Sequence, residues 1–395
     1  MRILADKNIP SVTEVFSDIG EVTAVETPLI SSHLIREADI LIIRSETSVN
    51  ERLLNGSPVR FVGSPTAGTD HVDIDFLGTN GIGFASAPGS NSNSVKEYVV
   101  AALLAFAVRR RISLRGKTLG VVGVGNIGSK VVKAAEALGM LVLQNDPPLA
   151  RMTGESRFVP LDRVLEADFL TLHVPLTRDG QDPTYHLFDE PQFSRMKKGA
   201  VLLNTARGPV VCTPALKRAL RQGLLSSELI DVWENEPSID IEALSLATIG
   251  TAHVAGYSMD GKVAAVLMVR EAACRYFGIS SASSPRQYLH EPDQPIIRLK
   301  AGGLADEAAL HGIVRQAYDV EEDDALLRVI LTLPEEARAA RFSHLRTGYS
   351  YRREFSNFTV ELPPEYARLS ATLMAIGFTA GRSGNELHPP AVTAE

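Results

Sequence analysis

The sequence is poor in cysteine and has no apolar run long enough to cross a membrane. Cys212 and Cys274 are the only cysteines among 395 residues, which excludes a disulfide framework and favours a reducing cytosol. The longest apolar run, residues 98–108, is far shorter than the ~20 residues that span a bilayer. Asp6 and Lys7 lie where a secretory signal would need an apolar segment. These absences predict a cytoplasmic protein without a membrane partner.

Basic residues are also fewer than acidic residues. Forty lysines and arginines face 47 aspartates and glutamates, giving a net charge of −7, so no overall field favours nucleic acid or anionic lipid as a partner. Hydrophobic residues make up 45% and charged residues 22%, as in ordinary globular proteins. One compact core rarely includes this many residues, so we expect two or three domains.

Short apolar segments alternate with helix-like segments along the first 280 residues, and this alternation favours parallel β/α units. It occurs in two series. The strand-like segments are 1–4, 38–44, 59–64 and 81–86 in the first series and 117–125, 140–146, 168–175, 200–206 and 226–233 in the second. Long helices are predicted at 93–110, with Asn93 or Ser94 as N-cap, and at 258–278.

The pattern changes after residues 279–285, which have the composition of a linker. The region beyond them mixes two strand-like and two helix-like segments. In the last helix-like segment an apolar face is expected from Tyr366, Leu369, Leu373 and Ile376. The fold class predicted for the chain is therefore α/β, with two doubly wound parallel-sheet domains followed by a small α+β domain.

The most informative stretch is a glycine-rich turn between a strand and a helix. Gly123, Gly125 and Gly128 form G-x-G-x-x-G, with Asn126 and Ile127 between the last two glycines. Such a turn lets the backbone approach a pyrophosphate at a helix N-terminus. The next strand ends at Asp146, whose carboxylate can accept both ribose hydroxyls of an adenosine and would repel a 2′-phosphate. This context predicts NAD as cofactor. The alternative is a glycine-tolerant loop in an ordinary doubly wound sheet.

Three residues, each just after a strand-like segment, form a candidate catalytic set. Arg207 can hold a carboxylate with two parallel hydrogen bonds, and His253 can take a hydroxyl proton while Glu236 orients its ring. Each one alone has an ordinary interpretation, as an ion-pair partner, a structural histidine or a solvated loop acid. Together they match the needs of oxidising a 2-hydroxy acid.

These stretches resemble the D-isomer-specific 2-hydroxyacid dehydrogenases. The resemblance rests on "TAGTDHVD", "GKTLGVVGVGNIGSKV", "NTARGPVV", "DVWENEP" and "TAHVAGYS". It implies a flavodoxin-like substrate-binding lid at 1–95 plus 258–280, a Rossmann NAD domain at 96–257, and a crossing of the chain between them near 90–96 and 255–260. No metal is expected.

Other stretches, such as "MRILADKNIP" and "FSHLRTGYSYRREF", resemble a subgroup of that family that oxidises 4-phospho-D-erythronate for pyridoxal phosphate synthesis. The subgroup implies a homodimer formed through a C-terminal domain at 286–380, with a tail at 381–395 predicted to be disordered. A 2-oxo acid that reoxidises the cofactor is a further expected partner. Implied substrate contacts are Ser45, Thr66 and Tyr257; implied NAD contacts are Asp146, Val174, Thr205, Ala206, Asp231 and Gly256.

A phosphorylated substrate needs a cation besides Arg207. Arg44 lies beside Ser45 at a strand end, and it is predicted to meet the phosphate unless an arginine of the C-terminal region does so. The C-terminal candidates are Arg346, Arg352 and Arg353. Three positions depart from the subgroup, namely Ser90, Cys212 and Val174, and the last leaves only a backbone or packing contact with the cofactor.

Two alternatives remain open at this point. One is another dehydrogenase of the same chemistry, such as 3-phosphoglycerate dehydrogenase, because residue spacing does not measure substrate length. The other is a binding module that uses NAD to control protein association. Retention of the whole catalytic set counts against the second.

Overall fold

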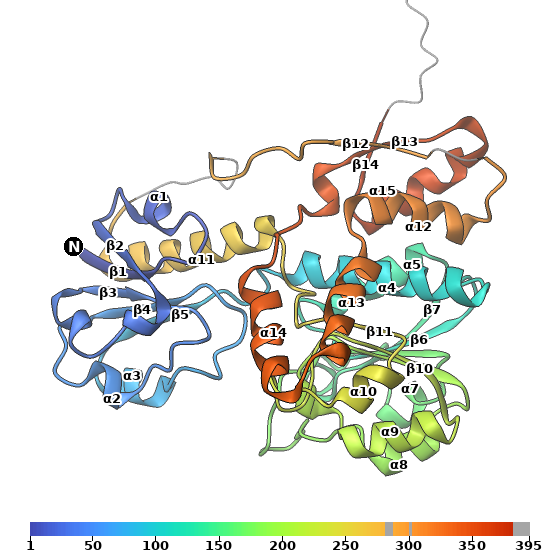
Figure 1. Cartoon of the computed structure of the whole chain (residues 1–395), viewed down its shortest axis with the longest axis horizontal. Coiled ribbons are helices and arrows are strands. Elements are labelled where there is room, and N and C mark those ends of the chain that lie inside the picture. The colour runs from blue at the N-terminus through green and yellow to red at the C-terminus, as the bar shows by residue number, and fades with distance from the viewer. Residues whose placement is uncertain (281–286, 300–301, 382–395) are drawn as a thin grey trace, which may run out of the picture.

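The computed structural model describes residues 1–280, 287–299 and 302–381 (Figure 1). Within them the chain forms a five-stranded sheet, a six-stranded sheet and a three-stranded sheet, accompanied by helices. The predicted fold class is confirmed. Most of the predicted linker at 279–285 and the predicted tail at 381–395, apart from Gly381, lie outside the described residues.

The first sheet is parallel throughout, with strand order β2-β1-β3-β4-β5. Its elements are β1 (Arg2–Asp6), α1 (Val12–Phe16), β2 (Glu21–Val25), η1 (Thr27–Leu29), η2 (Leu34–Glu37), β3 (Ile40–Ile42), α2 (Glu51–Leu54), β4 (Phe61–Ser64), α3 (Ile74–Thr79), β5 (Gly83–Ser86) and the distant α11 (Met259–Phe277). The order 2-1-3-4-5 is that of flavodoxin-like folds. Because side chains alternate along a strand, Ile3 and Ile40 pack with α1 and α11, whereas Leu4 and Leu41 pack in the opposite layer with α2 and α3.

The second sheet is also parallel, with order β11-β10-β9-β8-β6-β7. Its elements are β6 (Thr118–Val122), α5 (Gly128–Ala137), β7 (Leu141–Asn145), α6 (Pro147–Thr153), α7 (Leu161–Val164), β8 (Phe169–Leu172), α8 (Glu190–Arg195), β9 (Ala200–Asn204), η3 (Gly208–Val210), α9 (Thr213–Arg221), β10 (Leu225–Ile230), α10 (Ile241–Leu246) and β11 (Ile249–Gly250). A single parallel bridge from Gln144 to Phe158 lies beyond β7. It stands where a Rossmann fold has its third strand.

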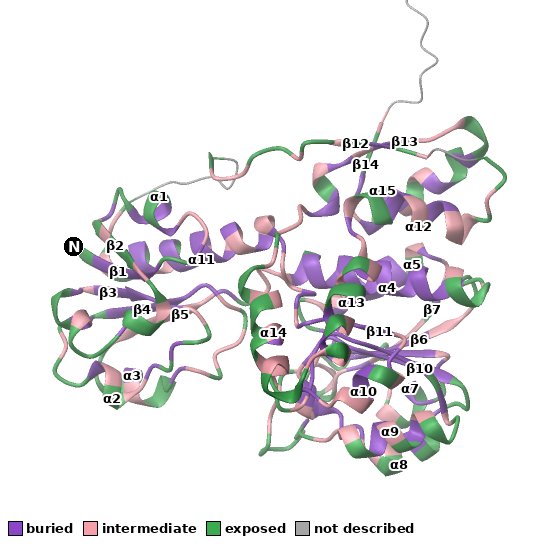
Figure 2. Ribbon diagram, viewed as in Figure 1, coloured by how far each residue is buried: buried purple, intermediate pink, exposed green. Residues whose placement is uncertain are grey.

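Helix α4 (Ser92–Arg110) is the central helix of the molecule. Nearly all its residues from 92 to 107 are buried, and Figure 2 shows it purple along most of its length. It packs against α5 on one part of its surface and against C-terminal helices on another. The predicted N-cap was Asn93 or Ser94, but the helix begins at Ser92 with Asn91 as N-cap. A helix that is apolar nearly all round must be covered on all sides.

The C-terminal region adds a parallel sheet of order β12-β13-β14 and several helices. Its elements are β12 (Ile296–Arg298), α12 (Asp306–Ala317), α13 (Val320–Arg328), η5 (Val329–Thr332), α14 (Glu335–Thr347), η6 (Phe355–Asn357), β13 (Thr359–Glu361), η7 (Pro364–Leu369), α15 (Ser370–Ile376) and β14 (Thr379–Ala380). The four residues expected on one helical face, from Tyr366 to Ile376, are all buried. Helices α13 and α14 were not among the segments expected from the sequence. Figure 1 shows α14 at the boundary between the two larger sheets.

A short C-terminal segment lies across both places where the chain passes between the two larger sheets. Glu354 accepts hydrogen bonds of 3.0 Å from the hydroxyls of Ser94 and Ser258. Beside it, Arg352 pairs with the Glu97 carboxylate at 2.6 Å. The starts of α4 and α11 are therefore tied to each other through one buried carboxylate.

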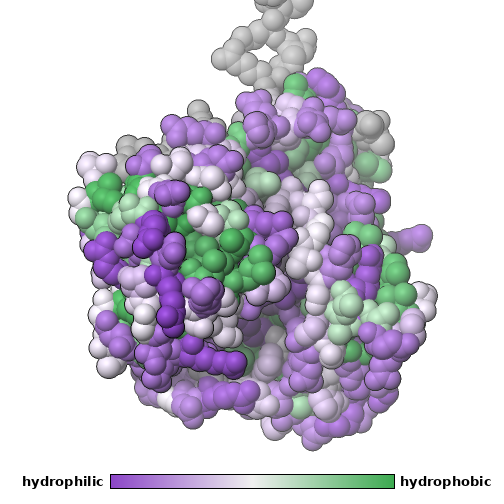
Figure 3. All heavy atoms as spheres, turned by 60° about the vertical axis from the view of Figure 1, so that its left-hand side comes forward, coloured by the Kyte–Doolittle hydropathy of each residue, from purple (hydrophilic) through white to green (hydrophobic). Residues whose placement is uncertain are grey.

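No helix among the described residues is both long and apolar enough to cross a bilayer. Figure 3 shows a mainly hydrophilic face on which hydrophobic side chains gather in several places.

One buried carboxyl group in the second sheet has no partner. Glu228 in β10 is fully buried, and neither of its carboxyl oxygens has a hydrogen-bond partner in the described part of the chain. Burial raises the pKa of Glu228 to about 8, because a charge without a partner is costly inside a protein. The folded protein therefore keeps this group protonated at neutral pH.

We expect this group to make the protein less stable as pH rises from about 5 to about 8. Across that window the unfolded chain has released the Glu228 proton while the folded chain still binds it, so stability falls by roughly 1.4 kcal/mol per pH unit from this group. Thermal unfolding of Glu228→Gln should show a weaker loss with rising pH than the parent protein. The exposed Glu14→Gln is the matched control, and parallel profiles for parent and Glu228→Gln would contradict the assignment.

Candidate active site

The predicted catalytic residues all lie at one edge of the second sheet. Arg207 follows β9, Glu236 lies in the loop after β10, and His253 follows β11. Because these strands are parallel, their carboxyl ends share an edge, which is where open α/β sheets bind ligands. The structure thus brings to one edge three residues that are spread over 46 positions of the sequence, from Arg207 to His253 (253 − 207).

His253 and Glu236 form a direct pair. The Nδ1 atom of His253 lies 2.8 Å from Oε2 of Glu236, while Oε1 of Glu236 accepts the Trp233 amide, also at 2.8 Å. Burial acts to raise the pKa of Glu236, but His253, the Trp233 amide and Arg346 outweigh it, so the pKa lies below its usual value. A carboxylate held ionised at Nδ1 keeps the proton on that nitrogen and leaves Nε2 free to accept one.

The backbone around His253 is fixed by the buried carboxylate of Asp231. One oxygen accepts the Thr251 hydroxyl at 2.6 Å and the Val254 amide at 2.8 Å; the other accepts the Ala255 amide at 3.0 Å. These contacts hold His253 at a positive φ of 57°, which costs free energy for a residue with a side chain. Asp231 is 1% exposed, so the structure gives it a positioning role, and its contact with NAD stays a prediction.

Arg207 faces the first sheet across the site. Its Nε lies 3.5 Å from the Asp70 carboxylate, and its guanidinium packs so closely against Gly68 that a Cβ there would lie 2.3 Å from Nη2. The backbone carbonyl of Ala206 accepts a hydrogen bond from Nη1 at 2.8 Å. The outer edge of the fork is therefore turned toward the loop after β4.

The residues implied to contact substrate meet in one small cavity. Arg44 and Ser45 follow β3, Thr66 follows β4, and Tyr257 precedes α11. All four line the same cavity, together with Lys262 and Tyr351, which the sequence analysis had not singled out. Thr66 also donates its hydroxyl hydrogen to the Gly68 carbonyl at 2.8 Å, so the cavity adjoins the loop that contacts Arg207.

Only one of the three C-terminal arginines considered for the phosphate lies at this site. Arg346 in α14 is 3.9 Å from the Glu236 carboxylate, and its Nη2 donates to the Tyr257 hydroxyl at 3.5 Å. Arg352 and Arg353 are instead paired with buried or half-buried carboxylates at the starts of α4 and α11. These two have structural roles.

The glycine-rich turn has the geometry that a dinucleotide requires. Gly123 has a φ of +87°, and a Cβ on Gly128 would lie 2.0 Å from the Gly123 carbonyl oxygen. No atom lies within 4 Å of a Cβ built on Gly125, so a pyrophosphate can approach there. Asp146 follows β7, and its oxygens accept the amides of Val124 and Leu149. Each oxygen retains a further acceptor position for a ribose hydroxyl.

The other implied cofactor residues border this turn. Val174 lies against Gly123, and Thr205 and Ala206 follow β9 in buried positions. Asn126, next to Ile127 at the start of α5, contacts Gly89, while Gly256 packs against Asn91. These residues therefore connect the turn to both crossings of the chain.

His173 is a residue of this region that sequence reasoning missed. Its ring lies between the hydroxyls of Thr171, 3.0 Å from Nε2, and Thr205, 3.1 Å from Nδ1. Burial lowers the pKa of His173 to about 3, so the ring is neutral at pH 7. The signal was its position directly after a strand of the nucleotide-binding sheet.

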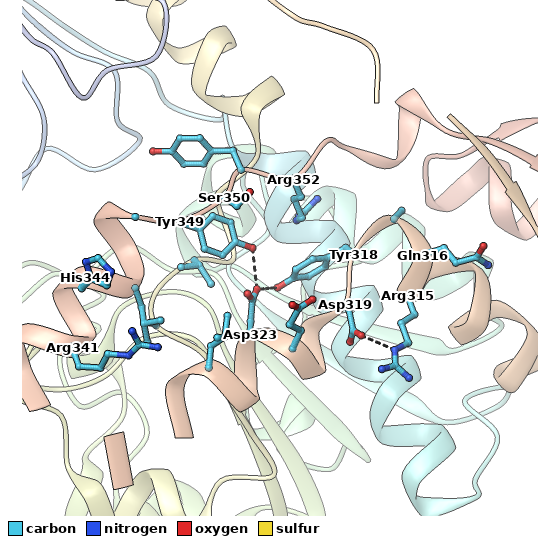
Figure 4. Close-up of a pocket in the computed structure, with 18 residues that line it drawn as sticks. Arg315, Gln316, Tyr318, Asp319, Asp323, Arg341, His344, Tyr349, Ser350 and Arg352 are labelled. Carbon is cyan, nitrogen blue, oxygen red and sulfur yellow. Dashed lines mark hydrogen bonds and ion pairs between the residues drawn. The ribbon is translucent and has the colours of Figure 1, made fainter. Parts of the chain in front are cut away.

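A larger cavity of about 620 Å³ lies behind the His253 loop, between Ala252, Val254 and the C-terminal helices. In Figure 4 the side chains of Tyr318 and Tyr349 point at Asp323, which accepts hydrogen bonds of 2.9 and 3.0 Å from their hydroxyls. Burial raises the pKa of Asp323 to about 6. None of the predicted site residues except Arg352 lines this cavity, so it is separate from the catalytic edge.

Comparison with known proteins agrees with this geometry. Residues 99–255 match the family described as D-isomer specific 2-hydroxyacid dehydrogenase, NAD binding domain, and residues 289–377 match a domain of unknown function. An erythronate-4-phosphate dehydrogenase of Salinibacter ruber is 46% identical over 368 residues, which are 91% of this chain and 94% of that one. The enzyme of the same name from Salmonella typhimurium is 43% identical over 99% of this chain and 100% of its own. The chain belongs to the erythronate-4-phosphate dehydrogenase family. The resemblance predicted from the sequence is confirmed.

Solved structures of erythronate-4-phosphate dehydrogenase's wider family share the fold. A D-lactate dehydrogenase from Aquifex aeolicus, complexed with NAD and lactic acid, is 26% identical with a TM-score of 0.56, covering 70% of this chain and 94% of that chain. A 3-phosphoglycerate dehydrogenase with bound NAD from Entamoeba histolytica has a TM-score of 0.61 at 23% identity, covering 70% and 95%. The second likeness shows the fold alone.

Replacing His253 with alanine should lower kcat by about 10²–10⁴-fold, because general base catalysis by one side chain contributes this much. The NAD dissociation constant, measured by fluorescence titration, should stay within a few-fold of the parent value.

His186→Ala is a closely matched control for that variant. His186 is 2.7 Å from Glu234 and its side chain is 27% exposed, compared with 29% for His253. This variant should keep its turnover. Near-parental kcat in His253→Ala would contradict the catalytic assignment.

Proposed function

We propose that the protein oxidises 4-phospho-D-erythronate at C2 with NAD, giving 3-hydroxy-2-oxo-4-phosphooxybutanoate in the synthesis of pyridoxal phosphate. The observation that supports this most directly is the His253–Glu236 pair, which lies at the same sheet edge as Arg207. The substrate itself is inferred from the names of the relatives. A cytoplasmic location is part of the same proposal.

The proposed reaction gives each catalytic residue one task. The guanidinium of Arg207 binds the substrate carboxylate and fixes the orientation of C2. Nε2 of His253 takes the proton of the C2 hydroxyl while the hydride leaves C2, and Glu236 stabilises the imidazolium that forms. The proton then passes to water, so the products are the 2-oxo acid, NADH and a proton.

NAD, when it is bound, accepts the hydride from the substrate. In this proposal the turn at Gly123, Gly125 and Gly128 lies against its pyrophosphate and Asp146 accepts its ribose hydroxyls. The remaining cofactor contacts are Asn126, Ile127, Val174, Thr205, Ala206, Arg207, Asp231 and Gly256. His173, which is neutral, would orient the Thr205 hydroxyl toward the cofactor.

We also propose the domain division that the sequence predicts. Residues 1–95 with 258–280 act as a lid, residues 96–257 bind NAD, and residues 286–380 form the dimerisation domain. The ion pair of 3.5 Å between Asp70 and Arg207 spans the lid and the NAD domain. A substrate carboxylate would replace Asp70 there as the lid closes and excludes water.

The first measurement should compare 4-phospho-D-erythronate with 3-phosphoglycerate. NADH formation would be followed with and without a 2-oxo acid, because a retained cofactor must be reoxidised before a second turnover. We expect turnover of the erythronate ester with a kcat/KM at least tenfold higher. Preference for 3-phosphoglycerate would contradict the proposed substrate but leave the proposed mechanism in place. Absence of turnover with either ester would favour an NAD-sensing binding module.

A homodimer through the C-terminal region is part of the proposal. Apolar side chains of this region are exposed at Ile296, Leu326, Val329 and Met374, with Ile296 on the edge strand β12. Exposed apolar groups and open strand edges favour association.

Sedimentation equilibrium should give twice the 42.7 kDa of one chain. Ile296→Lys should weaken the dimer, and Ile74→Lys, on α3 and similarly exposed, should not. A monomeric parent protein at micromolar concentration would contradict the proposal.

A further inference from the structure

Lys262 lies in the first turn of α11 and reaches into the small cavity lined by Arg44, Ser45 and Thr66. Its ammonium group is 3.9 Å from the centre of the Tyr257 ring and 5.6 Å from that of Tyr351. Within residues 1–280, 287–299 and 302–381, no carboxylate forms an ion pair with it. Its neighbours are thus two aromatic faces, which attract a cation only weakly compared with an anion.

The charges around Lys262 are mainly positive. Burial lowers the pKa of Lys262, and Arg44 and Arg346 act in the same direction, opposed by Tyr257 and Glu46. Glu46 is itself bound to Arg44 at 3.1 Å. Gathering cations in a half-buried place is costly unless an anion joins them.

Two other cations of the described residues, Arg352 and Arg353, differ from Lys262 in this respect. Arg352 is held by Glu97, and Arg353 by Asp260, each within hydrogen-bonding distance. These arginines stabilise the fold without a ligand. Lys262 differs because no carboxylate of the described residues pairs with its charge, so the ammonium group can bind an anion from outside the chain.

The position of Lys262 matches one end of the proposed substrate. Thr66 lines the Lys262 cavity, and Gly68, two residues later, contacts the fork of Arg207. One short loop therefore separates the proposed carboxylate site from Lys262. On the other side, Tyr257 and Arg346 connect the cavity to Glu236 and so to His253.

We propose that Lys262, together with Arg44, forms the subsite that binds the phosphate monoester of the substrate. This inference rests on the proposed function, in which a short 2-hydroxy acid has its carboxylate at Arg207 and its reacting carbon at His253. The phosphate dianion meets the two positive charges and the hydroxyl of Ser45. The cavity of about 30 Å³ holds only a few water molecules, so Lys262 and Tyr351 shift outward when the ester enters.

The test uses Lys262→Met, which keeps the length of the side chain and removes its charge. For 4-phospho-D-erythronate we expect KM to rise about 10- to 100-fold, the effect of losing a hydrogen bond to a charged group, with kcat within a few-fold of the parent. For unphosphorylated D-erythronate, kcat/KM should not change. Lys262→Arg should restore most of the affinity for the ester.

Two controls separate this role from a structural one. Lys198→Met removes an exposed lysine outside the site and should leave every constant unchanged. Lys262→Met should unfold at a temperature no lower than that of the parent, because the variant removes an unpaired buried charge, and its NAD dissociation constant should equal that of the parent. An unchanged KM for the ester, or an equal loss with both substrates, would overturn the proposal.

Calorimetric titration with inorganic phosphate distinguishes failure of this inference from failure of the proposed function. If the parent protein turns over neither ester, the proposed function fails. Phosphate binding by the parent and its loss in Lys262→Met would then still support an anion subsite. Equal binding by both, or binding by neither, would overturn it.

Discussion

The buried carboxylate of Asp231 is the constraint on which the catalytic edge depends. It accepts three hydrogen bonds from residues 251–255, and the Asp231 carbonyl accepts the His253 amide at 2.7 Å. The positive φ of His253 is unfavourable by itself. Four hydrogen bonds in a buried setting offset that cost and leave the imidazole in one position.

The C-terminal region contributes side chains that contact residues of the site directly. Helix α14 supplies Arg346, which contacts Glu236 and Tyr257. Helix α13 supplies Asp324, which accepts the Gly250 amide at 2.7 Å and so fixes the end of β11 just before the His253 loop. The segment at 352–357 ties the starts of α4 and α11 through Glu354. Movement of the first sheet relative to the second must therefore occur with this segment as a common anchor.

Sequence reasoning succeeded where the physical signal is local. The glycine turn, the strand-like segments and the apolar face from Tyr366 to Ile376 follow from periodicity and backbone requirements that act over a few residues. It failed for α13 and α14, whose sequences are rich in charged residues and which are held by contacts with α4, β11 and the loop of His253. It also missed Lys262, because a lysine in the first turns of a helix is usually solvated and no local pattern reveals its surroundings.

The sequence by itself determined the fold class, the nucleotide turn and the choice of the three candidate catalytic residues. Each of these depends on residue type at short spacing or on strand ends, which parallel sheets bring to one edge. Only the tertiary structure decided which charges are compensated. Arg352 and Arg353 are bound to carboxylates distant in sequence, whereas Lys262 shares a small cavity with Arg44, feels the charge of Arg346 and has no ion pair with a carboxylate of the described residues. Electrostatic free energy depends on distance and burial in three dimensions, and neither is contained in the order of residues along the chain.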